Sequence, residues 1–436
     1  MIPAIEKEHI EQIKSFQTQK LIEQLKYVNE NSKYYKRIWK ENNVDIHHVK
    51  NLEDLRNLPI TTKEDLQRYN DDFFCVDMVN IIDFASTSGT TGAPVNFGIT
   101  DKDLDRLAYN EAISFACAGI KRDDVVQLMT TMDRRFVAGL AYFLGLRKLG
   151  AGIIRTGAGI PALQWESILR NRPTYLIAVP SFLLKLIDYA EKNGIDLNNV
   201  GIKAAICIGE PLRNQDFTPS SLAQRINEKW NIKLFSTYAS TEMSTAFTEC
   251  EYLQGGHLHP ELIITEVLDK NNQPVAAGEY GELTITTLGI EGLPLVRFKT
   301  GDILKIEEEP CPCGRNTPRV GPVIGRAQQM IKYKGTTLFP PAIHDVLNGF
   351  KEISEHLIIL ETNELNTDHI TVKMTCSNPS FDFIEELKEA FRAKIRVVPN
   401  MEFVAPEEIN KIMMQQNSRK PKWVIDLRGS KKQLLK

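Results

Sequence analysis

Short apolar runs alternate with amphipathic helical stretches through the middle of the chain. The runs at 125–129, 175–179 and 204–208 have the length of buried strands, whereas 136–149 and 182–191 carry apolar residues at helical spacing. Strands that alternate with helices in this way are typical of a parallel sheet with crossover helices. We therefore predict an α/β fold built on such a sheet.

The pattern changes from about residue 262. Two runs of alternating apolar and polar residues, 263–268 and 282–287, are divided by turn-forming residues at 269–272 and 277–279. Period-two alternation between turn signals predicts antiparallel hairpins. The large N-terminal domain is thus expected to combine mixed or parallel sheets and helices with a β-hairpin subdomain.

A third pattern follows residue 326. Strand-like runs at 330–333, 357–360 and 369–374 precede a helical stretch at 381–393. A chain of 436 residues is also longer than one ordinary core requires. We predict two domains, an N-terminal domain over 1–326 and a small α+β C-terminal domain over 327–436.

Composition narrows the range of partners. Hydrophobic residues make up 42% and charged residues 25% of the chain, and the formal net charge is −3. These are globular values, and the weak negative charge argues against a general binder of nucleic acid or of an anionic membrane surface. No apolar run approaches the roughly 20 residues that span a bilayer, and the first residues are charged. We expect a cytoplasmic protein that acts on small molecules.

The loop after the apolar run 81–85 is the first candidate site. Ser86-Thr87-Ser88-Gly89-Thr90-Thr91-Gly92-Ala93-Pro94 interleaves hydroxyl side chains with glycines. Glycine lets backbone N–H groups approach an anion, and hydroxyls donate further hydrogen bonds. The loop is not a Walker motif, because no Gly-Lys-Ser/Thr follows. Composition alone would equally describe a polar surface turn.

The order of these residues resembles the phosphate-binding loop of the adenylate-forming superfamily, the acyl-CoA synthetases, luciferases and adenylation domains. The position before the proline is usually lysine there and is Ala93 here. The resemblance implies an adenylate-forming fold with a mobile C-terminal domain and a phosphate loop. Its nucleotide-binding residues would be Thr87, Ser88, Gly89, Thr90, Thr91 and Gly92.

A second segment, 237–242, follows the strand-like run 232–235. Taken alone, its Ser/Thr and Glu would be a helix cap, but a carboxylate at the end of a strand can also hold Mg²⁺. The segment resembles the superfamily's Tyr-Gly-x-Thr/Ser-Glu motif, with alanine in place of glycine. The resemblance implies that Tyr238, Ala239 and Ser240 contact the nucleotide. It also implies that Glu242 is the magnesium ligand and that Thr241 supplies a catalytic hydroxyl.

Three further segments match the superfamily in order. Gly209-Glu210-Pro211 follows a strand, at the edge where parallel sheets bind ligands, and resembles the segment that lies against adenine. Asp302, in an Arg-Phe-Lys-Thr-Gly-Asp segment, resembles the aspartate that binds the ribose hydroxyls. Arg326 would also contact the nucleotide, and Gln328 stands at the interdomain hinge, where Asp or Lys is usual.

Near the end of the chain, Arg419-Lys420-Pro421-Lys422 is, by composition, a solvated basic tail. Alignment of the following Val-Ile-Asp with the superfamily makes Lys420 the catalytic lysine that bridges the acyl carboxylate and the α-phosphate. Lys422 remains the alternative. A mobile ammonium at either position could stabilise the charge that develops on phosphate.

The first hundred residues indicate the branch. Segments 31–35 and 51–66 closely resemble the phenylacetate-CoA ligase family, and the similarity runs over essentially the whole chain. It implies an AMP-forming aryl- or arylacetate-CoA ligase that uses ATP, Mg²⁺ and coenzyme A, with a possible homodimer. Arg134 or Arg135 could favour a more polar acid. The alternatives are an adenylating enzyme with another carboxylate and a non-CoA acceptor, and a catalytically silent nucleotide-binding homologue.

The cysteines suggest a structural metal site. Cys311 and Cys313 flank a proline in a tight turn, and Cys250 and His257 lie shortly before the hairpins. Three thiolates and one imidazole can close a tetrahedral Zn²⁺ site, and similar segments occur in phenylacetate-CoA ligase relatives. Unrelated cytosolic thiols are the simpler alternative, and His259 is a competing ligand. The other cysteines, Cys75, Cys117, Cys207 and Cys376, are expected to be structural.

Overall fold

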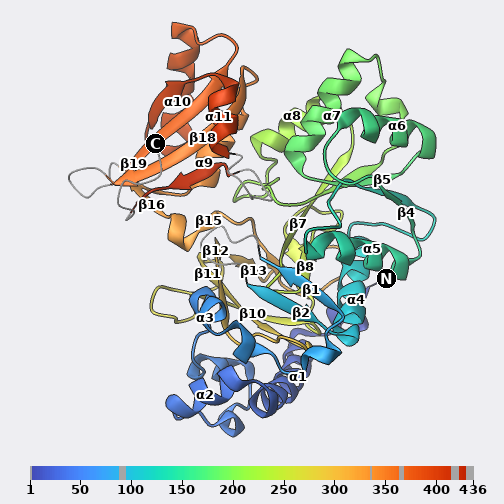
Figure 1. Ribbon diagram of the computed structural model, residues 1–436, viewed down its shortest axis with the longest axis vertical. Coiled ribbons are helices and arrows are strands. Elements are labelled where there is room, and N and C mark those ends of the chain that lie inside the picture. Colours follow the sequence, from blue (N-terminus) through green and yellow to red (C-terminus); the bar gives the residue numbers. More distant parts are fainter. Residues whose placement is uncertain (1, 88–94, 334–335, 363–367, 414–421, 429–436) are drawn as a thin grey trace. The chain divides into compact units, whose positions relative to one another are not determined.

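The computed structural model describes residues 2–87, 95–333, 336–362, 368–413 and 422–428 (Figure 1). Two compact units are present: Met1–Pro219 with Ile226–Val323, and Ser220–Arg225 with Ile324–Lys436. The predicted α/β class is confirmed. The functional division at residues 326 and 327 remains a prediction. None of the described helices combines the length and apolar character that crossing a bilayer requires.

A six-stranded sheet forms the centre of the first unit. Its strand order is β4-β3-β5-β6-β7-β8, and only the pair β7–β8 is antiparallel. The parallel sheet that the apolar runs predict is therefore correct, with one antiparallel strand added at an edge. Its strands are β3 (Val125–Leu128), β4 (Gly152–Arg155), β5 (Tyr175–Ala178), β6 (Ala204–Cys207), β7 (Lys233–Ser240) and β8 (Thr245–Thr248).

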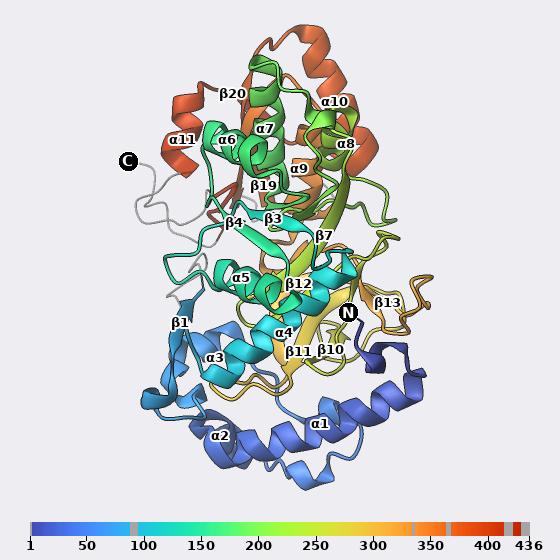
Figure 2. The same ribbon diagram turned by 90° about the vertical axis from the view of Figure 1, so that its right-hand side faces the viewer.

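Helices connect the parallel strands, as crossover topology requires. Figure 2 shows α5 (Val137–Leu149) beside α4 (Asp101–Cys117). These two helices touch through a glycine: a Cβ on Gly145 would lie 2.2 Å from Cβ of Glu111. The remaining crossover helices are α6 (Pro161–Asn171), α7 (Pro180–Lys192) and α8 (Ser221–Lys229). The helices predicted at 136–149 and 182–191 are α5 and α7.

The predicted hairpins are present in the same unit. Ile263 of β10 (Ile263–Leu268) pairs with Thr287 of β11 (Gly281–Thr287), and β11 pairs with β12 (Phe298–Leu304). Side chains of these strands share a core with α1 (Ile10–Asn31) and α2 (Lys33–Glu41). The shorter elements are α3 (Lys63–Arg68), β1 (Asp83–Ser86), β2 (Asn96–Ile99), β9 (Gly256–His257), β13 (Ile306–Glu307) and β14 (Arg319–Val320).

The second unit contains a four-stranded sheet in the order β20-β19-β18-β21. These strands are β18 (Ile353–Thr362), β19 (Asp368–Cys376), β20 (Asn400–Phe403) and β21 (Val424–Asp426). The helices of this unit are α9 (Pro340–Asn348), α10 (Phe381–Ile395) and α11 (Pro406–Met413). Its remaining strands, which lie outside that sheet, are β15 (Gly325–Arg326), β16 (Ile331–Tyr333) and β17 (Thr336–Leu338). Buried residues of α9, α10, β19 and one face of β18 share one core, whereas Leu357 and Ile359 of β18 pack with Ile409 of α11.

Candidate functional site

Two of the predicted nucleotide segments lie at one edge of the central sheet. Cys207, at the end of β6, pairs with Ser236 of β7 in parallel register. Gly209 and Tyr238 each lie two residues beyond this pair, so both lie toward the carboxyl edge of the sheet. Parallel sheets bind ligands at this edge.

The tyrosine motif at 237–242 and the aspartate motif that ends at Asp302 meet through a hydrogen bond. The Tyr238 hydroxyl donates to a carboxylate oxygen of Asp302 at 2.7 Å. Tyr238 lies on β7, and Asp302 lies on β12 of the hairpin region and is 7% exposed. The expectation that the tyrosine motif follows a strand ending at residue 235 was wrong, because β7 continues through Ser240.

Arg297, the first residue of the Arg-Phe-Lys-Thr-Gly-Asp motif, has a structural role. Arg297 is buried, and its guanidinium makes two hydrogen bonds, at 3.1 and 3.0 Å, to the carboxylate of Glu266. It also donates to the backbone carbonyl oxygens of Arg56 and Leu58. Arg297 therefore fixes the start of β12, the strand that presents Asp302.

Glu210 has a role that the sequence did not predict. Its carboxylate accepts hydrogen bonds at 2.8 Å from both the backbone N–H and the hydroxyl of Ser181. Ser181 lies in the first turn of α7, where N–H groups lack intrahelical partners. Burial raises the pKa of Glu210, and the bonds from Ser181 partly offset this rise. Glu210 thus anchors its loop to a helix, and its predicted contact with the nucleotide remains a prediction.

Thr87 marks the base of the predicted phosphate loop. Its N–H donates to the carbonyl oxygen of Val95, and its hydroxyl accepts from the N–H of Val95, both at 3.1 Å. These bonds extend the β1–β2 ladder by one residue. The other predicted members of the loop, Ser88, Gly89, Thr90, Thr91 and Gly92, lie outside the described residues.

The two arginines considered for acid specificity lie in a turn with left-handed backbone, with φ values of 57° at Arg134 and 59° at Arg135. The carbonyl oxygen of Arg135 accepts from the N–H of Ser86, and its guanidinium donates to Asn96 at 3.3 Å. Ser86 and Asn96 are the paired ends of β1 and β2. Arg135 therefore supports the base of the predicted phosphate loop.

The structure describes some of the remaining predicted site residues but not all of them. Ser240 ends β7, its hydroxyl accepts from the N–H of Met243, and the half-buried Thr241 and Glu242 lie in the turn before β8. In the second unit, Arg326 ends β15, and the carbonyl oxygen of Gln328 accepts from Arg428. Lys420 lies outside the described residues. The magnesium, hinge and lysine assignments remain predictions.

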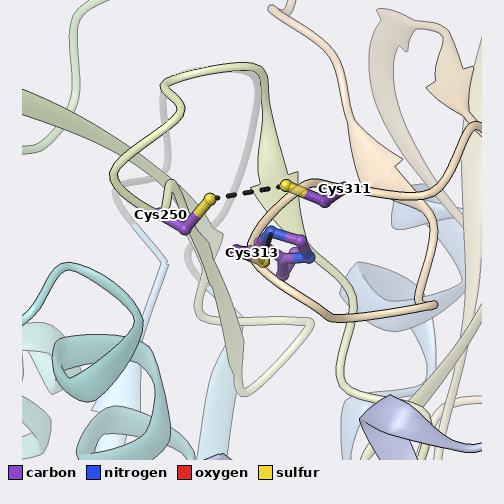
Figure 3. Close-up of side chains that lie close together, drawn as sticks. Cys250, Cys311 and Cys313 are labelled. Carbon is purple, nitrogen blue, oxygen red and sulfur yellow. Dashed lines mark hydrogen bonds between the residues drawn. The ribbon is translucent and has the colours of Figure 1, made fainter.

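The predicted metal ligands converge. Ligand atoms of Cys250, His257, Cys311 and Cys313 all lie within 4.8 Å of one another. Figure 3 shows the sulfurs of Cys250 and Cys311 pointing toward each other, 3.6 Å apart. The Sγ of Cys313 lies 3.4 Å from Nε2 of His257. Residues 61 positions apart in the sequence thus form one cluster.

The spacing suits a tetrahedral zinc ion. Two sulfurs, each about 2.3 Å from such an ion, would be about 3.8 Å apart, and a sulfur and a nitrogen would be about 3.6 Å apart. Burial raises the pKa of Cys250 to about 12, so an uncompensated thiolate would be unfavourable there. A bound cation would supply the compensating charge. Both the donor set and its spacing fit Zn²⁺.

The structure distinguishes the two candidate histidines. Both ring nitrogens of His259 are engaged, Nδ1 at 2.6 Å from Glu6 and Nε2 at 3.2 Å from Ser114. His257 turns Nε2 toward Cys313, with Nδ1 at 3.4 Å from the Thr317 hydroxyl. Burial lowers the pKa of His257 to about 3, so its ring is neutral, as a ligand must be. His257 is the fourth member of the cluster.

A surrounding network reaches the first residues of the chain. Arg315 donates to Sγ of Cys313 at 3.4 Å and to Glu6 at 2.8 Å. Burial, the largest single cause, would raise the pKa of Cys313, but hydrogen bonds with Arg315 and Cys311 and the charge of Arg315 together outweigh it, and the pKa is lowered. Glu6 is fully buried in the 3₁₀ turn Ala4–Lys7. Arg315 directly follows Cys-Pro-Cys-Gly and therefore had a local signal in the sequence, whereas Glu6 had none.

Cys117 lies nearer to the cluster than its sequence position suggested. It packs with Cys250, Cys311 and Cys313 in one buried group. Its thiol donates to the carbonyl oxygen of Thr248 at 3.4 Å. The expectation that Cys117 is structural fits this bond to the main chain.

Comparisons with known proteins agree with this architecture. Residues 40–290 match the family described as "AMP-binding enzyme", and 335–428 match its C-terminal domain. Phenylacetate-coenzyme A ligase of Thermus thermophilus is 29% identical over 87% of this chain and 85% of its own length. The Escherichia coli ligase of the same name is 27% identical over 88% and 86%. A 2-hydroxyisobutyryl-CoA ligase bound to 2-HIB-AMP has 25% identity and a TM-score of 0.82 over 95% and 89%.

The chain belongs to the AMP-binding enzymes, since the family match covers more than half of it. Within that family it is an AMP-forming acyl-CoA ligase, so the enzyme class predicted from the ordered motifs is confirmed.

Proposed function

We propose that this enzyme ligates aryl or arylacetic acids to coenzyme A at the expense of ATP. The Tyr238–Asp302 bond at the carboxyl edge of the central sheet is the observation that carries the proposal, because it joins two predicted nucleotide residues from different sheets. The similarity to phenylacetate-coenzyme A ligases supports the class of acid. Phenylacetate is the first acid to test.

In the first step the acid's carboxylate attacks the α-phosphorus of ATP, and the bond to the β-phosphate breaks, releasing pyrophosphate. Such a displacement depends on positioning and on neutralising charge. Residues 87–92 would hold the phosphates, and Lys420 would bridge the carboxylate and the α-phosphate. Glu242 would hold Mg²⁺, which supplies charge neutralisation on the phosphates when bound.

In the second step the sulfur of CoA attacks the acyl carbon, the acyl–phosphate bond breaks, and AMP leaves. Lys420 is needed only for the first step. By resemblance, the second unit would turn about Gln328 and present a different face for the second step. Hinge motions of this kind commonly gate enzyme reactions.

The acid pocket is the least constrained part of the proposal. Arg135 already supports the base of the phosphate loop, so Arg134 is the better candidate for contact with a polar acid. Arg134→Ala should change the ranking of acids, whereas Arg135→Ala should lower turnover with all of them. An unchanged ranking in both variants would remove arginine from acid selection.

The Cys250, His257, Cys311 and Cys313 cluster supports a second role, a structural Zn²⁺ site that is closed because all four positions are taken by protein. We place this site outside the reaction, since its ligands are turned toward one another. A cytoplasmic location and a homodimer complete the proposal.

The deciding experiment measures pyrophosphate release from Mg-ATP with aryl, arylacetic and aliphatic acids, with and without CoA, and identifies products by mass spectrometry. An acyl-CoA from one preferred arylacetic acid supports the proposal. Acyl-AMP without thioester would indicate a different acceptor. No product with any acid would favour the catalytically silent homologue.

A further inference from the structure

A half-buried histidine and a buried histidine, His344 and His356, face each other in the second unit. Nδ1 of His344, on α9, lies 2.7 Å from Nε2 of His356, on β18, and the ring centroids are 5.0 Å apart. At this distance one ring must donate its N–H and the other must accept, so the two rings cannot both be cationic. Burial lowers the pKa of both, that of His356 to about 4. The pair is neutral near pH 7.

His356 also contacts an aromatic ring. The centroid of His356 lies 5.9 Å from that of Trp423, at an interplanar angle of 42°. Trp423 is held through its main chain as well, because its carbonyl oxygen accepts from the N–H of Ile358 at 3.0 Å. Directly after it, β21 pairs in parallel with β18, Val424 opposite Ile358. Ring and backbone therefore fix the same residue.

This anchored residue lies close in sequence to both candidate lysines. Trp423 follows Lys422 directly and Lys420 by three residues. Three extended residues span at most about 10–11 Å, so a lysine at 420 cannot act far from Trp423. All these contacts lie within the second unit and would move with it.

We propose that His344, His356 and Trp423, the histidine–tryptophan column, position the lysine-bearing segment for the adenylation half-reaction. The inference rests on the proposed two-step ligase. Burying an imidazole costs free energy unless it is hydrogen-bonded, whereas two apolar side chains would fill the space without that requirement. The directional bond between the rings holds His356 at one orientation, against which Trp423 packs.

The half-reactions test this role with His356→Phe, which keeps a ring but loses the bond to His344. Adenylation is measured as the exchange of labelled pyrophosphate into ATP in the presence of phenylacetate. Thioester formation is measured separately, with synthetic phenylacetyl-adenylate and CoA as substrates. We expect exchange to fall about tenfold, the equivalent of about 1.4 kcal/mol, and thioester formation to stay within about twofold of wild type.

Matched variants separate positioning from general damage. His356→Gln retains a hydrogen-bonding group and should recover part of the exchange. His369→Phe makes the same replacement on β19, at a ring that contacts Tyr333 instead, and should leave both half-reactions unchanged. Trp423→Leu should reproduce the His356→Phe pattern, and the double variant should lose less than the sum of the two.

Limited trypsin digestion gives a readout independent of catalysis. Trypsin cuts after Lys422 but poorly after Lys420, which precedes proline. Cleavage at the 422–423 bond should be several-fold faster in His356→Phe than in wild type or His369→Phe. Equal loss of both half-reactions, or unchanged cleavage, would overturn the inference. If wild type forms no adenylate with any acid, the proposed function fails and the cleavage alone decides the positioning.

Discussion

The cysteine–histidine cluster and the residues predicted to bind nucleotide differ in how completely they are enclosed. His257, Cys250 and Cys311 are at most 5% exposed, and Cys313 is half-buried. Among the predicted nucleotide residues Asp302 is buried, but Tyr238, Glu242 and Glu210 are only half-buried. A site for a permanent occupant can be sealed by its own side chains, whereas a site for a substrate must keep an opening.

The two sites also differ in the connections around them. The cluster is tied to Arg315, Glu6 and His259, all of which are buried. The predicted nucleotide residues instead form hydrogen bonds to residues of neighbouring strands and helices, as Glu210 does to Ser181 of α7. We therefore expect changes at the cluster to act on stability and changes at the nucleotide site to act on kinetics.

The largest effect is expected for Cys311→Ser. A closed site holds one ion, so native protein should contain about one zinc per chain, and the variant should contain almost none. Elemental analysis with thermal unfolding checks this, and the melting temperature should fall clearly. Cys376→Ser, in the second unit, is the control. Native protein free of zinc, together with an unchanged melting temperature in Cys311→Ser, would refute a structural metal.

For the predicted catalytic lysine, Lys420→Ala should slow adenylation by about 10²–10³-fold, the scale for loss of one group that stabilises charge in the transition state. Thioester formation from supplied acyl-adenylate should change little, and the melting temperature should stay the same. Lys422→Ala is the matched comparison. If Lys422→Ala gives the larger loss, the assignment moves to Lys422.

Glu6→Gln tests whether the outer network closes the metal site. The change removes the charge that Arg315 and His259 share, and charged hydrogen bonds contribute about 1.5–3 kcal/mol each. Zinc should pass to a chromogenic chelator about tenfold faster, with pyrophosphate release little affected. Glu11→Gln, on the exposed side of α1, controls for charge. Equal release rates in both variants would leave the network without influence on the metal.

The smallest effect is expected for Tyr238→Phe. The ring remains, but the hydrogen bond to Asp302 is lost. A hydrogen bond to a charged group contributes about 1.5–3 kcal/mol, and we expect only part of this free energy to act on ATP binding. The KM for ATP should rise about three- to tenfold, with unfolding in urea unchanged. A loss of stability without a change in KM would make the pair structural and weaken the contrast between the sites.

Much of the fold was predictable because the central strands are short and almost wholly apolar. β5 and β6 are buried at every position, and their helical partners have clear periodicity. The long helix α1 was not anticipated, although it buries Leu21, Leu25 and Val28, because its many polar residues weaken the apolar pattern. The extent of β7 was missed because several of its last residues are polar, which interrupts the apolar run.

The site was predictable where chemistry is local in sequence. Cys311 and Cys313 share one turn, and the tyrosine motif is contiguous, so each stood out. Partners that come from distant segments left no signal: Ser181 for Glu210, Glu6 for Arg315, and His344 for His356. These pairings depend on how helices and strands pack, which no local pattern records.

The bond between Glu6 and Arg315 also sets a time limit on assembly. The two residues are 309 positions apart, and a ribosome adds about 5–20 residues per second. Glu6 therefore emerges roughly 15–60 s before its partner exists. During that interval the carboxylate cannot be buried with its partner, so the first turn of the chain is one of the last parts of the first unit to reach its final place.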